Sequence, residues 1–298
     1  MEQLEIPIFF AVDDAYIPLL EVTIRSLVER KNEKDIYRIR VLYTNVNEEN
    51  KKEIMKYSKD NVEIEFVNVQ KEFEILQGKL LVRDYYSNAT YYRILIPNMY
   101  PQYDKVIYLD ADIIILEDIA ELYNTNMVNC LLAGVPEPWF EQYNEFQVYA
   151  ERIIGVTNYK KYINVGVLLM NLKELRAMNF EDVFLHLLDV VRYTFLQDED
   201  YINKICKGRI KYLDSSWNVC GYLSNESNPK IIHYTLFKPW QKKNMKNNEY
   251  FWNTAKKTNF YEYFKSLITE TNEVNAEKSL NEFIRIAQDE ISCVVMDK

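Results

Sequence analysis

The chain has 298 residues, 48% of them hydrophobic, and a formal net charge of −9. The negative charge disfavours an extended nucleic-acid footprint, and no window approaches the ~18 consecutive apolar residues of a membrane-spanning helix. The first residues, Met1–Glu5, are acidic and lead directly into an apolar run, unlike the basic start of a signal peptide. We therefore expect a soluble, cytoplasmic protein that does not bind nucleic acid.

The first part of the chain alternates between strand and helix patterns. Apolar or alternating runs predict strands at Ile6–Val12, Tyr37–Tyr43, Val62–Val69 and Lys105–Leu109. Helical spacing predicts helices at Pro18–Arg30, Asn47–Tyr57 and Ser87–Leu95, the last stopped by Pro97. This order predicts an α/β fold with a parallel sheet covered by helices on both faces. Ligands bind such sheets at the carboxyl ends of strands, where the pairs Asp13/Asp14 and Asp110/Asp112 fall.

The rest of the chain is less regular. A strand-like run, Tyr162–Leu172, contains Asn164 and Gly166, and a predicted helix, Phe180–Phe195, precedes an acidic cluster at 198–200. The last part, 271–298, has an amphipathic helical pattern with an acidic outer face. Its apolar face consists of Leu280, Phe283, Ile284, Ala287, Ile291 and Val294. We expect one domain at 1–265 and a helical extension at 266–298 that packs on the domain or mediates self-association.

Cysteine and glycine spacing excludes several kinds of site. The four cysteines are too scattered for a zinc site or a disulfide framework: Cys130, Cys206, Cys220 and Cys293. The six glycines form no glycine-rich phosphate loop. A nucleotide bound by this acidic chain would need a divalent cation or a basic patch. Seven lysines against one acid occupy 230–257; this segment could hold a diphosphate, meet an anionic acceptor or membrane surface, or simply face solvent.

The strongest motif is Asp110-Ala111-Asp112, directly after the predicted strand that ends at Leu109. Two carboxylates one residue apart can converge on Mg²⁺ or Mn²⁺, which also bridges diphosphate oxygens. An ordinary acidic turn is the simpler alternative. A phosphatase with an aspartyl nucleophile also uses this pattern, but its motif has a hydroxyl residue where this chain has Ile114.

Four segments, in order, resemble glycosyltransferase family eight, which includes bacterial lipopolysaccharide galactosyl- and glucosyltransferases and glycogenin. They are Phe10–Tyr16; Tyr91–Arg93 with the strand to Asp112; Tyr162–Leu172 with Gln197–Asn203; and Ile232–Tyr234 with Lys238–Trp240. The resemblance implies a GT-A fold, with one Rossmann-like mixed sheet flanked by helices. It also implies a UDP-sugar donor, Mn²⁺ or Mg²⁺ as cofactor, and retention of anomeric configuration.

The resemblance also implies roles for individual residues. Asp110, Asp112 and His233 would ligate the metal. The nucleoside end of the donor would lie against Ala11, Asp13, Asp14 and Tyr16, with Ala111 beside the metal ligands. Arg93 would contact the donor sugar or diphosphate, Asn164 and Asp198 would bind hydroxyls of the transferred sugar, and Lys238 would bind the diphosphate.

Several of these residues have simpler interpretations. Asp13 could cap a helix, Arg93 could form a structural ion pair, Asn164 could cap a strand end, and His233 could be an ordinary buried histidine. The aromatic residues at 139–149 could form core rather than a sugar platform.

Three positions depart from the family pattern. Ala15 replaces a residue expected to contact ribose, and Leu236 stands where the family has glycine. Glu199 replaces a common glutamine near the reacting face of the sugar. We hypothesise that Glu199, with Asp198 and Arg93, acts in catalysis, and that its charge stabilises an oxocarbenium-like transition state rather than forming a covalent adduct.

The sequence therefore predicts a retaining hexosyltransferase that transfers glucose or galactose from a UDP-sugar to a carbohydrate or glycoconjugate. A nucleotide-sugar hydrolase and a non-catalytic sugar-nucleotide-binding protein remain as alternatives. The identity of the sugar and of the acceptor is left open.

Overall fold

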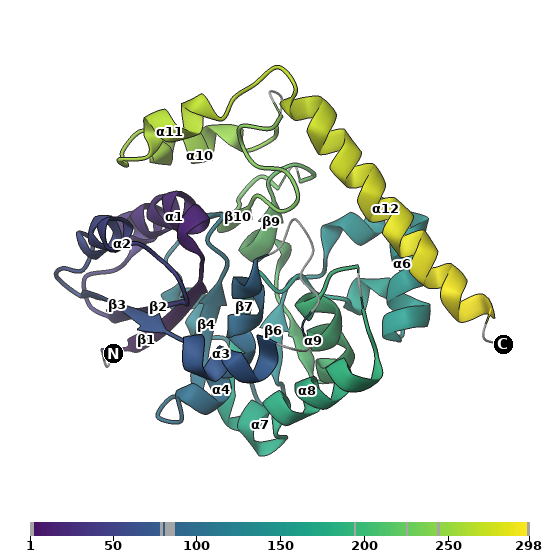
Figure 1. The fold of residues 1–298 in the computed structure, drawn as a ribbon. Helices are drawn as coiled ribbons and strands as arrows, with labels where there is room; N and C mark the ends of the chain where they lie inside the picture. The colour runs from purple at the N-terminus through teal and green to yellow at the C-terminus, as the bar shows by residue number, and fades with distance from the viewer. Residues whose placement is uncertain are drawn as a thin grey trace.

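Two β-sheets organise the fold (Figure 1). The computed structural model describes residues 3–77, 80, 87–193, 195–224, 226–242 and 245–296. The larger sheet has the strand order β3-β2-β1-β4-β7-β6-β8. Its strands in chain order are β1 (Glu5–Ala11), β2 (Ile36–Tyr43), β3 (Val62–Asn68), β4 (Lys105–Leu109), β6 (Leu132–Gly134), β7 (Val167–Asn171) and β8 (Ile210–Tyr212). Strands β3, β2, β1 and β4 run parallel, whereas β7 is antiparallel to β4 and β6.

Helices cover both faces of this sheet, and the last ones pack beyond it on other helices (Figure 1). In chain order the helices are α1 (Ile17–Arg30), α2 (Glu48–Met55), α3 (Gln70–Gln77), α4 (Ile96–Met99), α5 (Ala120–Tyr123), α6 (Asn144–Tyr149), α7 (Leu172–Ala177), α8 (Phe180–Val190), α9 (Asp198–Cys206), α10 (Asn248–Ala255), α11 (Tyr261–Ser266) and α12 (Asn272–Met296). Alternate residues of β1 enter different cores: Ile8 and Phe10 join the core under α1 and α2, and Phe9 joins the core of the other face. This two-sided burial explains why β1 is an unbroken apolar run.

The smaller sheet joins three segments that are far apart in the sequence: β5 (Ile113–Ile115), β9 (Val219–Cys220) and β10 (Ile231–His233). Strand β10 lies between the other two, antiparallel to β5 and parallel to β9. The 3-10 turn η6 (Ser215–Asn218) leads into β9. This sheet therefore places the residues flanking Asp112, Asn218 and His233 beside one another.

The predicted elements are confirmed for β1, β2, β3, β4, α1 and α2, and four expectations are wrong. The sheet is mixed, as the family resemblance implies, and not wholly parallel as the order of strands and helices alone predicts, because β7 returns antiparallel. Only Val167–Asn171 of the predicted strand 162–172 is strand, and the residues before it turn into the site. The predicted helix 180–195 ends at Val190. Residues Asn88–Leu95 form a 3-10 helix, and Pro97 lies in the first turn of α4 instead of ending a helix, because a first-turn proline loses no hydrogen bond.

The C-terminal helix α12 lies against α6, as Figure 1 shows. Gln288 Nε2 donates to Glu145 Oε1 of α6 at 3.0 Å, and the predicted apolar residues Leu280, Phe283 and Ile284 pack on the core. Packing on the domain is thus confirmed, while self-association and the 265/266 boundary stay predictions. The side chains of Cys293 and Val294 lie outside the described set. Within that set, no helix is both long and apolar enough to cross a bilayer.

The lysine-rich segment is largely paired with acids of the same chain. Lys230 pairs with Glu121, Lys242 with Glu277, and Lys257 with Glu29. These pairs reduce the free positive charge that an anionic surface would meet. Lys243 lies outside the described residues.

Candidate active site

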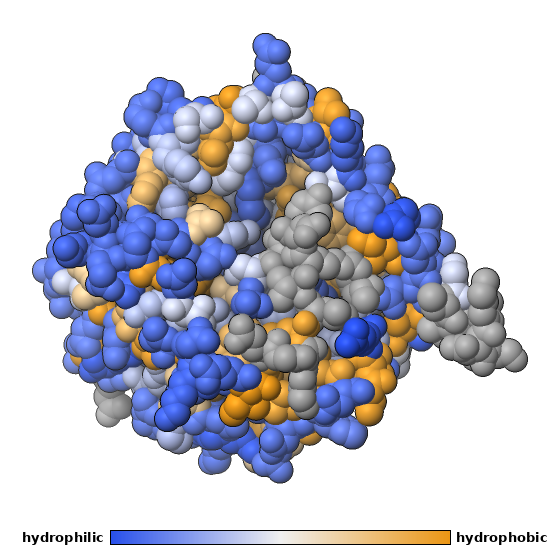
Figure 2. All heavy atoms as spheres, viewed as in Figure 1, coloured by the Kyte–Doolittle hydropathy of each residue, from blue (hydrophilic) through white to orange (hydrophobic). Residues whose placement is uncertain are grey.

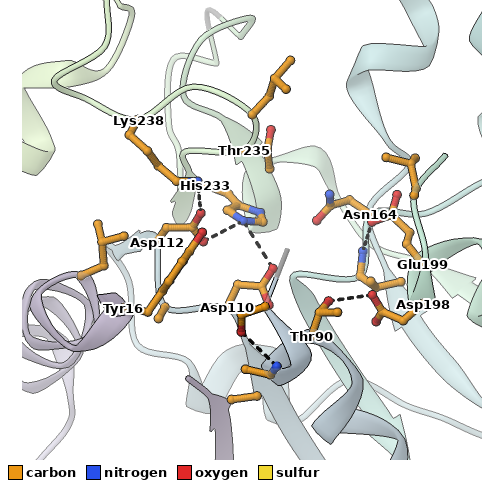
Figure 3. A pocket seen from close by; sticks show the side chains of 18 of the residues that line it. Tyr16, Thr90, Asp110, Asp112, Asn164, Asp198, Glu199, His233, Thr235 and Lys238 are labelled. Atoms are coloured by element: carbon orange, nitrogen blue, oxygen red, sulfur yellow. Dashed lines mark hydrogen bonds and ion pairs between the residues drawn. The ribbon is translucent and has the colours of Figure 1, made fainter. Parts of the chain in front are cut away.

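A cavity of about 450 Å³ opens at the carboxyl ends of β1 and β4. Every residue predicted to act in catalysis or in metal or donor binding lines it except Asp14. These residues are Ala11, Asp13, Tyr16, Arg93, Asp110, Ala111, Asp112, Asn164, Asp198, Glu199, His233 and Lys238. They come from segments spread over more than two hundred positions of the chain, so the fold assembles them into one site (Figure 3).

Asp14 instead holds the loop after β1 against the start of α2. Its carboxylate accepts hydrogen bonds from the backbone and side-chain amides of Asn47 and from the side chain of Asn50. Asp13 caps the following 3-10 turn, with the Tyr16 amide donating to its Oδ1 at 3.2 Å. The helix-capping interpretation of Asp13 is therefore correct, although its side chain also reaches the cavity.

Asp110, Asp112 and His233 form a group that could hold a metal ion. One ligand atom from each lies within 4.8 Å of the others. His233 Nε2 is 3.2 Å from Asp112 Oδ1 and 3.7 Å from Asp110 Oδ2. Ligands at right angles on bonds of about 2.1 Å are about 3 Å apart, so this spacing suits a divalent ion. From α1, Thr23 Oγ1 donates to the carbonyls of Ala111 and Ile113, which secures the loop carrying both carboxylates.

A chain of hydrogen bonds sets the proton position on His233. The Gly166 backbone N–H, which can only donate, is bound by Asn164 Oδ1 at 3.0 Å. The same oxygen accepts from Asn218 Nδ2 at 2.8 Å, so Asn218 Oδ1 is turned to His233 Nδ1 at 3.1 Å. Nδ1 must then carry a hydrogen, which leaves the Nε2 lone pair of a neutral imidazole facing the two carboxylates. That arrangement is repulsive unless a cation lies between them, either a proton on Nε2, which is the state that lowers the pKa of Asp112, or a metal ion, so it fits a metal site.

Asn218 was not predicted, and it provides a test of this chain. Replacing Asn218 with alanine is expected to weaken Mn²⁺ binding about 10- to 100-fold, the usual effect of losing a partner that orients a metal-bound histidine. Isothermal titration with MnCl₂ would measure it. Asn228→Ala, an exposed asparagine on the same segment, is the matched control. Equal Mn²⁺ affinities in the two variants would contradict the orienting role.

Lys238 lies against Asp112 rather than free in the cavity. Its Nζ is paired with Asp112 Oδ2 and donates to the Tyr234 carbonyl at 2.9 Å. Burial opposes the charge on Asp112, but Lys238 and His233 more than offset it and hold the pKa of Asp112 well below its ordinary value. Both groups are thus charged at neutral pH, with the lysine beside the metal ligands.

Arg93 bridges the metal group and the acidic cluster. Its guanidinium pairs with Asp110 at 3.4 Å and with Asp198 at 2.9 Å, and Nη1 donates to the Val165 carbonyl at 2.6 Å. Nε and Nη2 also donate to Thr90. With all three nitrogens engaged, Arg93 acts as the ion-pair residue considered above, and it orients the two aspartates.

The acidic cluster begins α9 after a strained residue. Gln197 is fully buried with φ 51° and ψ −119°, an unfavourable conformation for a non-glycine residue that is common at functional sites. Among the described residues, two buried carboxyl oxygens of cavity-lining side chains make no hydrogen bond: Asp198 Oδ2, which is ion-paired with Arg93 Nε at 2.9 Å, and Glu199 Oε1. Glu199 Oε1 therefore keeps its hydrogen-bonding capacity for a ligand's hydroxyl group.

Burial changes the protonation of this cluster. It raises the pKa of Asp198 to about 6, against the opposing effect of Arg93, and that of Asp200 to about 7. Burial, reinforced by neighbouring Glu137, raises the pKa of Glu199 well above its ordinary value. Glu199 Oε2 accepts the Val165 N–H at 3.0 Å, so its proton belongs on Oε1, toward the cavity. The surroundings therefore favour the neutral carboxyl of Glu199 in the unliganded site, whereas the sequence-based hypothesis assumes a charge, and the catalytic role of Glu199 stays a prediction.

These shifts predict a pH dependence of stability. The folded carboxyls keep protons that the unfolded chain releases near pH 4, so the folded state binds more protons and loses stability as pH rises. From pH 5 to pH 8, Asp198 and Asp200 together account for a few kcal/mol, or roughly 5 °C. Thermal unfolding across this range measures it.

Glu199→Gln tests whether Glu199 acts as a neutral carboxyl, because glutamine is uncharged and has nearly the same shape. The amide keeps an acceptor for Val165 and a donor toward the cavity, so activity within about threefold of wild type and a higher unfolding temperature at pH 8 are expected. A large loss of activity with unchanged stability would instead support a charged Glu199.

Leu236, which stands where the family pattern has glycine, has a φ of 60°, in the left-handed region that glycine adopts without strain. The departure from the family pattern adds a leucine side chain to the cavity.

The fold and the site together define a glycosyltransferase of the GT-A class. The profile of Glycosyl transferase family 8 matches residues 7–244, and the chain belongs to this family. A Haemophilus influenzae protein named as a glycosyltransferase is 30% identical over 217 residues, covering 71% of this chain and 62% of its own length. The Salmonella typhimurium lipopolysaccharide 1,3-galactosyltransferase is 25% identical over 155 residues, covering 50% of this chain and 44% of its own length.

A solved structure shares the fold. The galactosyltransferase LgtC, in complex with donor and acceptor sugar analogues, superposes with a TM-score of 0.69 at 24% identity. The match covers 85% of this chain and 96% of LgtC. The GT-A fold expected from the sequence is confirmed.

Proposed function

We propose that the chain is a metal-dependent, retaining hexosyltransferase that transfers glucose or galactose from a UDP-sugar to a carbohydrate or glycoconjugate acceptor. The observation that carries this proposal is the group of Asp110, Asp112 and His233 at the floor of an open cavity, with Lys238 beside it. Two carboxylates and an imidazole are a donor set that Mn²⁺ accepts, and Mg²⁺ is the alternative ion. When bound, the ion would neutralise charge that develops on the departing diphosphate.

The two ends of the cavity suit the two ends of such a donor. Tyr16 and Lys238 lie on one side of the metal group, and Asp198 and Glu199 on the other (Figure 3). The diphosphate would meet Lys238, and the nucleoside would meet Ala11, Asp13 and Tyr16. The hexose hydroxyls would bind Glu199, whose Oε1 makes no hydrogen bond among the described residues, with Asp198 and Asn164 beside it.

Retention of configuration is taken from the family resemblance, and the raised pKa of Glu199 favours a route to it without a covalent nucleophile. A carboxyl that keeps its proton does not attack the anomeric carbon. We therefore favour attack by the acceptor hydroxyl on the face from which the nucleotide leaves, with Glu199 as a hydrogen-bond donor. Mass spectrometry that detected a glycosyl adduct on Glu199 would contradict this mechanism.

A donor screen tests the proposal. UDP release is measured for UDP-glucose, UDP-galactose and other nucleotide sugars, with Mn²⁺ and with EDTA, in the presence and absence of acceptor sugars. The expected result is Mn²⁺-dependent release that acceptors accelerate, with a glycosylated product. Release without any transfer product would indicate a hydrolase, and Mn²⁺ and UDP binding without turnover would indicate a binding protein.

A further inference from the structure

The cavity continues beyond its polar residues into an apolar wall, defined here as Leu196, Leu236, Trp240, Tyr263, Leu280 and Phe283. Each of these side chains remains partly accessible, and Tyr263 is 44% exposed. Tyr263 belongs to α11, and Leu280 and Phe283 belong to α12. These three residues follow position 244, where the family match ends, so this part of the wall is an addition to the family's common domain.

Specific contacts hold the wall in place. Asn272, at the start of α12, donates to the carbonyls of Trp240 and Leu267 at 3.0 and 2.8 Å. Further along the helix, Glu277 pairs with Lys242 at 3.5 Å. These contacts tie α12 to α11 and to the loop that carries Trp240. The accessible apolar side chains therefore lie on a surface whose elements are held together by specific contacts.

The wall runs along the opening from the diphosphate side to the sugar side. Trp240 follows Lys238 by two residues, while Phe283 packs edge-on against Phe195 with ring centroids 5.9 Å apart. Phe195 precedes Asp198 by three residues, which places the Phe283 end beside the proposed hexose position. Figure 2 shows the molecule hollowed below the α10–α11 segment, with hydrophobic residues beside the hollow.

The chemistry of the wall indicates what contacts it. Every group of a UDP-sugar is polar or charged apart from the base and sugar faces, and its proposed contacts lie deeper, against Tyr16, Lys238 and Asp198. The part of the reaction complex that remains at the opening is the acceptor beyond its attacking hydroxyl. An uncharged, partly accessible apolar surface binds apolar groups by removing them from water.

We propose that the apolar wall binds the aglycone of the acceptor, which is a glycoside whose attacking sugar lies between the donor hexose and the wall and whose apolar chain lies against Trp240, Tyr263, Leu280 and Phe283. This inference rests on the proposed glycosyl transfer at the same site. It adds the chemical class of the acceptor: amphiphilic, with a sugar head and an apolar tail.

Alkyl glycosides of graded length test it. Initial rates are measured with the fastest donor and with methyl, butyl and octyl β-glucosides and β-galactosides below their micelle concentrations. Each methylene removed from water is worth about fourfold in affinity, so KM is expected to fall at least about tenfold from methyl to octyl. In a Leu280→Asn/Phe283→Asn variant, the ratio of the KM for the methyl glycoside to the KM for the octyl glycoside is expected to fall below about threefold.

Val274→Asn is the matched control, because Val274 is 53% exposed on the same helix and does not line the cavity; it is expected to keep the wild-type ratio. If the double variant does not fold, Tyr263→Ser on α11 replaces it and is expected to reduce the ratio. Calorimetric titration with octyl glycoside in the absence of donor separates the two proposals. If the wild-type protein binds octyl glycoside and the Leu280→Asn/Phe283→Asn variant does not, the role of the apolar wall is supported even when no donor is turned over. Equal KM and equal binding for methyl and octyl glycosides would overturn the wall while leaving sugar transfer intact.

Discussion

Asp112→Asn is expected to abolish Mn²⁺-dependent UDP release and also to destabilise the protein. Asp110→Asn is expected to abolish UDP release without lowering the stability. Both carboxylates belong to the metal group, and losing either should reduce activity at least about 100-fold, because a bound ion contributes several kcal/mol to stabilising charge. They differ in burial: the Asp112 side chain is 7% exposed and that of Asp110 is 28% exposed.

The difference in stability comes from Lys238. Without the Asp112 carboxylate, this largely buried lysine loses its paired charge and keeps only neutral acceptors, the Tyr234 carbonyl and the amide oxygen of the substituted side chain. Removing one member of a buried ion pair costs about 3 kcal/mol at the low end of the usual range, or roughly 5 °C in unfolding temperature for a chain of this length. Thermal unfolding of both variants, without metal, measures this difference in stability. Equal unfolding temperatures would show that Lys238 does not depend on Asp112, and full activity in either variant would remove the basis for the metal site.

Gly166→Ala is expected to eliminate Mn²⁺ binding and transfer, although glycine 166 ligates nothing. A Cβ at this position would lie under 3.0 Å from Asp110 Oδ2 and from the His233 ring. Both neighbours are held by other contacts: Asp110 by Arg93 and Tyr108, and His233 by Asn218. The added methyl must therefore displace two metal ligands, and overpacking of this kind also costs about 1–3 kcal/mol.

Gly134→Ala provides the control for Gly166→Ala. This second buried glycine would place its Cβ 2.8 Å from Ile163 Cδ1, the end of a side chain that can rotate away. Calorimetry with MnCl₂ should show no binding in the first variant and wild-type affinity in the second. Comparable Mn²⁺ affinities would mean that the ligands can shift without loss of the site.

The sequence was informative where a local pattern determines the structure. The apolar run of β1 and the strand leading to Asp110 each bury both faces, so their composition alone identifies them. His233 was recognisable because Lys238 and Trp240 follow it at the spacing of the family. The aromatic residues 139–149 are mostly core, since Phe140, Phe146 and Tyr149 are all buried.

Other features depend on contacts between distant residues, which no local pattern encodes. Asn218 orients His233 from fifteen positions away, and Glu137 accepts from Asn164 at 2.6 Å and raises the pKa of Glu199. An asparagine before a short strand and a glutamate in an aromatic segment carry no signature of these roles. The same holds for Glu199: its residue type suggested a charge, and only the burial supplied by the fold reverses that expectation.

The pairing of β5 with β10 has a consequence for how the protein folds. His233 is paired with Ile113, the residue after Asp112, so a slip of one position would turn the imidazole to the opposite face of the small sheet. The two ligands are separated by 121 positions, and contacts between such distant segments close late because of their loop entropy. Metal affinity should therefore appear only in the last stage of refolding, and saturating Mn²⁺ should slow unfolding by stabilising the fully registered chain alone.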